Sequence, residues 1–69
     1  MKGKYAVTDG AFVWPVKNLA EARKKAKKLA LSNLTKVWII KPSKRKGYIV
    51  VEEYYVRKGK NGKYEVYKI

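Results

Sequence analysis

The sequence predicts a single small α+β domain over residues 1–69 with the element order β-β-α-β-β-β. Two dipeptides that favour tight turns, Asp9-Gly10 and Asn61-Gly62, each lie between β-forming stretches and signal a hairpin. Apolar residues between positions 19 and 30 recur at helical spacing, and a chain this short builds only one core. A strongly bent antiparallel sheet or incomplete barrel packed with one helix satisfies all three observations.

The first hairpin is expected over residues 4–16. If Asp9-Gly10 forms a two-residue turn, Val7 pairs with Phe12, and alternate side chains of the two strands share one face. Pro15 limits further pairing because it has no backbone N–H, so the second strand is expected at a sheet edge.

The only helix is predicted over residues 18–33, which also hold the densest positive charge. Asn18 is placed to cap the first free N–H groups, and Glu21 is placed to complete a capping box. The apolar stripe is mostly alanine, so the helix is expected to pack closely on its partner. The rest of its circumference is cationic: Arg23, Lys24, Lys25, Lys27 and Lys28.

Three further strands follow the helix in the prediction. The apolar run in residues 36–41 suits a strand covered on both faces, and residues 42–46 form a basic loop. A long strand spans residues 47–58, with a bend or bulge at Glu52-Glu53, and residues 63–69 form the last strand.

The expected pairing of the last hairpin determines which side chains share a face. A two-residue turn at Asn61-Gly62 places Val56 opposite Tyr67. The helix and a curled N-terminal hairpin are then expected to cover one half of the sheet from both sides, with Trp14 and Trp38 in the core. A one-residue slip caused by a bulge would exchange the two faces.

Composition excludes several classes of function. The chain has no cysteine and no histidine, which excludes disulfides, thiol chemistry and ordinary zinc sites, and no cofactor is expected. Glu52 and Glu53 are neighbours on a strand and point to opposite faces, so a paired carboxylate site is not expected and the chain is interpreted as not an enzyme. No stretch is apolar enough for a signal peptide or a membrane span, which favours an intracellular location in the cytoplasm or nucleoid.

The net charge of +13 favours a polyanionic partner. Cations cluster on the helix, in one loop and around one turn, and they alternate with tyrosines on the strands, which is typical of nucleic-acid binding. Most are lysine, which suits phosphate better than base edges. A platform of Tyr55, Tyr64, Arg57 and Lys68 is expected to stack bases of a single strand or to lie in a duplex groove. The remaining predicted contact residues are Lys44, Arg45, Lys46, Lys58, Lys60, Lys63, Arg23, Lys24, Lys27 and Lys28.

The element layout resembles two families. From Tyr5 to Val56, including the alanine-lysine helix, it resembles the monomeric archaeal methanogen chromosomal proteins, although this chain lacks their long proline-rich basic loop. The stretch KNLAEARKKA at residues 17–26 is similar to the strand–helix–strand core of small bacterial and phage domains. The first resemblance implies a chromatin-like role.

The expected function is therefore phosphate-dominated nucleic-acid binding with little sequence preference, in a chromatin-like, viral or accessory protein, with duplex DNA favoured and a single strand or RNA possible. The alternative is a small protein-interaction module, for example a phage or viral inhibitor that docks on an acidic protein surface. The helix stripe is too small to anchor in lipid, so no membrane partner is expected, and no small-molecule substrate is expected either.

Overall fold

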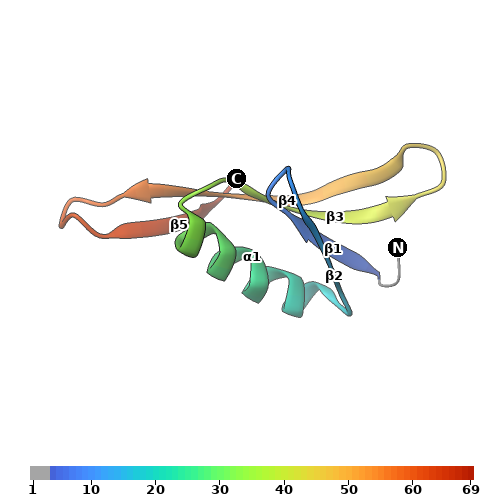
Figure 1. Cartoon of the computed structure of the whole chain (residues 1–69), viewed down its shortest axis with the longest axis horizontal. Helices are drawn as coiled ribbons and strands as arrows, with labels where there is room; N and C mark the ends of the chain where they lie inside the picture. Colours follow the sequence, from blue (N-terminus) through green and yellow to red (C-terminus); the bar gives the residue numbers. More distant parts are fainter. Residues whose placement is uncertain (1–3) are drawn as a thin grey trace.

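The computed structural model describes residues 4–69 as one curled, open antiparallel sheet with a single helix on one face (Figure 1). The predicted α+β class and element order are confirmed. Residues 1–3 lie outside the described residues, and the expectation that the N-terminus carries no signal peptide falls partly on them. The elements are β1 (Tyr5–Thr8), β2 (Val13–Val16), α1 (Leu19–Asn33), β3 (Val37–Ser43), β4 (Gly47–Lys58) and β5 (Tyr64–Lys68).

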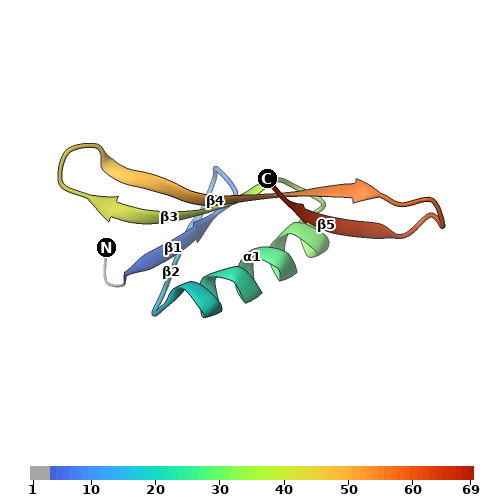
Figure 2. The same cartoon turned by 180° about the vertical axis from the view of Figure 1, so that it is seen from behind.

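The five strands lie in the order β2-β1-β3-β4-β5, and every neighbouring pair is antiparallel. The longest strand, β4, has 12 residues and runs along the main axis of a molecule that measures 44 × 19 × 19 Å. The β3–β4 hairpin projects at one end and the β4–β5 hairpin at the other, as both views show (Figures 1 and 2). The molecule is therefore elongated, with a turn at each end.

Local signals determine both ends of α1. The Asn18 side chain accepts a hydrogen bond from the Glu21 N–H at 2.8 Å, which is the expected N-cap. The helix ends at Asn33, and the C-cap residue Leu34, with φ of 50° and ψ of 49°, is a non-glycine residue in the left-handed region. In the described part of the chain, no helix has the length and apolar character needed to cross a membrane.

The core lies between α1 and the sheet face beneath it. Ala22, Ala26 and Ala30 are fully buried and pack with strand residues that include Ile39 and Tyr54. Because an alanine side chain is a single methyl group, the helix approaches the sheet closely, as its stripe predicts.

The first hairpin has a longer loop than predicted. The Asp9 carboxylate accepts hydrogen bonds from the N–H groups of Ala11 and Phe12, each at 2.9 Å, so residues 9–12 form the loop. Val7 therefore pairs with Trp14 and not with Phe12. This register differs from the predicted one by two residues, so the strand faces stay as expected.

The bulge predicted near Glu52 is present. Ile39 pairs with Glu52, but its neighbour Ile40 pairs with Val50, which leaves Val51 as the extra residue on β4. This extra residue places the Glu52 side chain on the face that packs against α1.

The turn between β4 and β5 has three residues and not two. The Gly59 N–H donates to the Lys63 carbonyl at 2.7 Å, and the Gly62 N–H donates to the Gly59 carbonyl at 3.0 Å. Gly62 has a φ of 81°, which suits the left-handed position that ends such a turn. Val56 therefore pairs with Val66, one residue from its predicted partner, so Tyr67 shares a face with Tyr55 and not with Val56 as expected. The bulge places Tyr54 and Val56 on the face opposite Trp38, whereas they were expected on the same face as Trp38.

The expectation that half of the sheet is covered on both sides is wrong. The N-terminal hairpin extends the sheet edge and does not fold over it, so the face opposite α1 is open (Figures 1 and 2). Val50 and Tyr48 on this open face are 48% and 55% exposed. Trp14 and Trp38 are only partly buried and lie outside the core cluster, which corrects the prediction that both belong to it.

Candidate nucleic-acid interface

The cations form three separate groups on the described residues. Lys24, Lys27 and Lys28 are exposed on the outer side of α1. The other two groups occupy the β3–β4 turn and the β4–β5 turn, which lie at opposite ends of the long axis (Figure 1). The sheet therefore separates two basic tips, with the helical cations between them on one face.

The β3–β4 turn presents Lys44, Arg45 and Lys46 at the end of a paired hairpin. Strand pairing continues up to Ser43 and Gly47, so the predicted basic loop of residues 42–46 is shortened to three residues. Gly47 has a φ of 80°, a conformation that glycine adopts without a side-chain clash. All three cations are exposed.

The β4–β5 turn presents the second basic tip. Lys58, Lys60 and Lys63 are exposed around the three-residue turn. A shallow depression beside it is lined partly by Arg57 and Tyr67. The acid Glu65 also lines this depression, so the second tip is less uniformly positive than the first.

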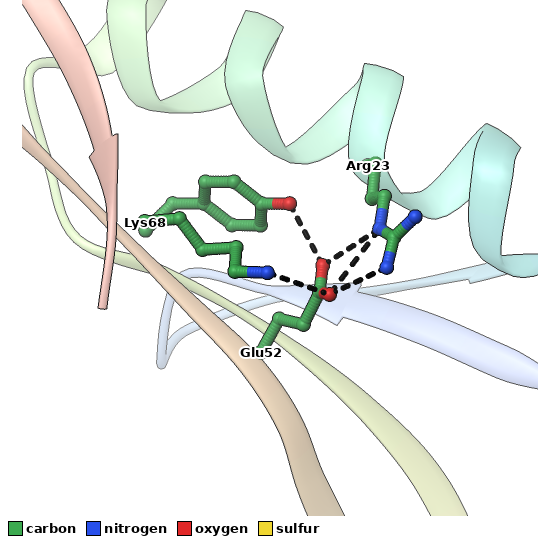
Figure 3. A network of polar contacts seen from close by, with 4 residues as sticks. Arg23, Glu52 and Lys68 are labelled. Atoms are coloured by element: carbon green, nitrogen blue, oxygen red, sulfur yellow. Dashed lines mark hydrogen bonds and ion pairs between the residues drawn. The ribbon is translucent and has the colours of Figure 1, made fainter.

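Two predicted contact residues, Arg23 and Lys68, are bound to Glu52 (Figure 3). Arg23 on α1 donates through Nη2 at 2.8 Å and through Nε at 3.0 Å, and the Lys68 ammonium lies 3.4 Å from the same carboxylate. The Tyr54 hydroxyl donates to this carboxylate at 2.8 Å. The Glu52 side chain is only 9% exposed. The network joins the helix to the sheet, and because Arg23 and Lys68 are paired with Glu52, neither is a freely available cation for a ligand.

The network changes the acidity of its members. The Arg23 hydrogen bonds, with help from Tyr54 and Lys68, lower the pKa of Glu52 to about 2 against the desolvation that opposes ionisation. Burial and the hydrogen bond to Glu52 raise the pKa of Tyr54 to about 12. Glu52 is therefore ionised and Tyr54 neutral throughout the physiological range.

The expected platform of Tyr55, Tyr64, Arg57 and Lys68 is divided between the two faces of the sheet. The three-residue turn pairs Tyr55 with Tyr67, and their rings stack with centroids 5.5 Å apart and planes at 25°. Tyr55 and Arg57 therefore lie on the open face with Tyr67. Tyr64 and Lys68 lie on the face that packs against α1, because strand neighbours alternate.

A surface that the sequence interpretation missed lies on the open face beside the first tip. It is an apolar groove of about 530 Å³ at the junction of β2, β3 and β4. Trp38 and Ile40 are two residues apart on one strand, and Tyr48 and Val50 are two apart on the next. The sequence pattern therefore already placed these four side chains on one face. The missing information was that no element covers Tyr48 and Val50, while Ile40 is 5% exposed and Trp38 is partly buried. The main lining residues are Val13, Trp38, Ile40, Tyr48 and Val50.

No protein-family model, curated protein or solved structure matches this chain in the comparisons with known proteins. The arguments about function therefore depend on the chain's own residues.

Proposed function

We propose that this protein binds nucleic acid mainly through backbone phosphates and with little sequence preference. The observation that supports this most directly is the placement of the unpaired cations. Among the described residues, carboxylates pair only with Arg23, Lys36 and Lys68. The lysines of both tips and of the outer helix surface stand without such a partner in a chain of net charge +13.

The electrostatic repulsion among these cations, which lowers the stability of the fold, supports an anionic partner. Like charges gathered on so small a domain repel one another and disfavour folding, and they repel most strongly when no counter-charge is near. A polyanion that contacts the tips and lies within range of the helical charges would reduce this repulsion and would release the counterions condensed on its own phosphates.

The type of cation supports low sequence preference. Lysine is a flexible point charge that suits phosphate oxygens, whereas arginine and amides read base edges through paired hydrogen bonds. The tips hold only one arginine within their turns, Arg45, and the outer helix cations that remain free are all lysine. The binding energy is therefore assigned chiefly to phosphate contacts.

A salt titration tests this proposal. Affinity for duplex DNA, single-stranded DNA, RNA and the acidic polymer poly-glutamate is measured by fluorescence anisotropy at several salt concentrations. If about six phosphates are contacted, log K falls against log salt with a slope near −5 for duplex DNA. A flat salt response, or tighter binding to poly-glutamate than to every nucleic acid, would contradict the proposal.

Two triple variants separate the tips from the helix. Replacement of Lys44, Arg45 and Lys46 by Gln is expected to reduce the salt slope by about 3, which is about 1 for each phosphate that is no longer neutralised. Replacement of Lys24, Lys27 and Lys28 by Gln removes the same charge and is the matched control. We expect the helix variant to lose affinity mainly at low salt, because charges away from the bound phosphates are screened beyond about 10 Å at 0.1 M salt.

A protein-interaction module that docks on an acidic protein surface is the second candidate function. The exposure of Ile49 and Val51 at 45% and 37% favours it, because phosphate binding makes no use of aliphatic side chains. Charge-to-Gln variants weaken both kinds of complex. Ile49→Ser together with Val51→Ser weakens only docking on a protein, so this pair distinguishes the two candidates.

A further inference from the structure

The open face of the sheet has a groove whose lining contains no charged side chain. Its residues come from β1, the first loop, β2, β3 and β4, and the largest are Trp38 and Tyr48. The volume of about 530 Å³ falls within the range of small-ligand sites. A site of this size accepts a flat ring system.

The lining is unusually exposed for apolar residues. Val13, Tyr48 and Val50 are 53%, 55% and 48% exposed, and α1 lies on the other side of the sheet (Figure 2). A continuous apolar surface that no element of the described chain covers indicates a binding site, because exposing it to water is unfavourable.

The charges around the groove restrict its occupant. The β3–β4 turn places Lys46 directly before Gly47 in the lining, and the Lys36 ammonium lies 6.0 Å from the centre of the Trp38 ring. Two acids lie near the groove. Glu53 is paired with Lys36 at 3.1 Å, and Asp9, between the lining residues Thr8 and Gly10, accepts hydrogen bonds from the N–H groups of Ala11 and Phe12. A second copy of this chain carries the same charge of +13 and would be repelled.

An occupant must therefore combine negative charge with flat apolar groups. Nucleotides of a single strand do so, because their unpaired bases expose ring faces while each linkage provides a phosphate. In a duplex the ring faces are stacked and only base edges are accessible, so a duplex cannot fill the groove in this way.

We propose that the groove binds the bases of single-stranded nucleic acid, with Trp38 and Tyr48 as stacking surfaces and the cations of the β3–β4 turn on the neighbouring phosphates. This inference rests on the proposed nucleic-acid-binding function and specifies its ligand. It transfers the base-contacting role from Tyr55 and Tyr64 to a different pair of aromatic residues.

The first experiment compares oligo-dT with an abasic strand of the same length and phosphate number. Stacking on a base contributes enough to make oligo-dT bind about 5- to 100-fold more tightly. Tyr48→Ala is expected to remove most of this difference and to leave affinity for the abasic strand and for duplex DNA unchanged. Tyr48→Phe keeps the ring and is expected to bind as the parent does.

Tyr64→Ala is the matched control, because Tyr64 is 49% exposed, close to the 55% of Tyr48, but lies on the other face of the sheet. Far-ultraviolet circular dichroism verifies that each variant is folded. Equal losses for Tyr48→Ala and Tyr64→Ala, or equal affinity of the parent for abasic and dT strands, would overturn the groove assignment while leaving phosphate binding intact.

Tryptophan fluorescence gives a second readout that needs no change in the groove. In a Trp14→Phe background, Trp38 is the remaining tryptophan, and oligo-dT is expected to quench it while the abasic strand does not. Unchanged emission at saturating oligo-dT would overturn the inference. Failure of every nucleic acid to bind, in the titrations described above, would overturn the proposed function together with it.

Discussion

Replacing Glu52 by Gln tests the polar network that joins α1 to the sheet. The change keeps the shape of the side chain and removes its negative charge, which pairs with Arg23 and Lys68 and accepts the Tyr54 hydroxyl. Since this carboxylate is 9% exposed, little water takes the place of these partners.

The size of the expected loss of stability follows from the pKa of the Glu52 carboxyl group. Glu52 has a pKa lowered from 4.5 to about 2, and each unit corresponds to about 1.4 kcal/mol, which sets an upper limit of about 3–4 kcal/mol. Both cationic partners are about half exposed, so solvent screening reduces this contribution. We expect Glu52→Gln to lower the free energy of unfolding by about 1–2 kcal/mol at pH 7.

The pH dependence of the free energy of unfolding shows whether the charge of Glu52 causes this loss of stability. A carboxyl group whose pKa is lowered by folding stabilises the protein above its unfolded pKa, and this stability disappears as the pH falls toward the folded pKa. The parent is therefore expected to lose the Glu52 contribution between about pH 5 and pH 2, and Glu52→Gln to lack that loss.

Urea denaturation followed by circular dichroism across this pH range provides the measurement. Glu53→Gln is the matched control, because Glu53 is the next residue and pairs with Lys36 on the other face with its side chain 29% exposed. If Glu52→Gln and the parent lose stability in parallel between pH 5 and pH 2, the network does not depend on the charge of Glu52 and the argument is refuted.

Three further changes test the core and the helix end. The pKa of Tyr54, raised to about 12, predicts stability that is complete below pH 10 and lost as the pH rises toward 12, and in Tyr54→Phe this loss should be absent from alkaline denaturation curves. Ala26→Leu should destabilise the fold by about 1–3 kcal/mol because Ala26 is fully buried, whereas Ala20→Leu at an exposed position should leave the urea midpoint within error. Leu34→Gly should raise the thermal midpoint, because glycine adopts the left-handed conformation with less strain and Leu34 is 52% exposed; a lower midpoint would show that its side chain packs usefully.

The helix and its packing surface are predictable from the sequence because their signals are local. Asn18 caps the N–H of a residue three positions away, and the buried alanines follow one another by four positions. No distant residue is needed to recognise either feature. The start of the long strand at Gly47 is equally local, since a glycine with positive φ follows the turn.

The face on which each aromatic side chain lies is not predictable in the same way. One extra residue in the turn before β5 placed Tyr55 and Tyr64 on opposite faces, and the bulge at Val51 decided that Tyr55 shares the face of Trp38. The two turn dipeptides indicated hairpins correctly, but loop length also depends on hydrogen bonds such as those that the Asp9 carboxylate accepts.

The sequence alone determined five strands, one capped helix and a large excess of positive charge, because propensity, capping and composition act over a few residues. Only the tertiary structure decided that α1 covers one face of the sheet and leaves Trp38 and Tyr48 beside an open groove. Only the tertiary structure decided that Glu52 binds Arg23 and Lys68. The reason is that side chains alternate across a strand, so a one-residue change in register, set by contacts between distant segments, exchanges core and surface.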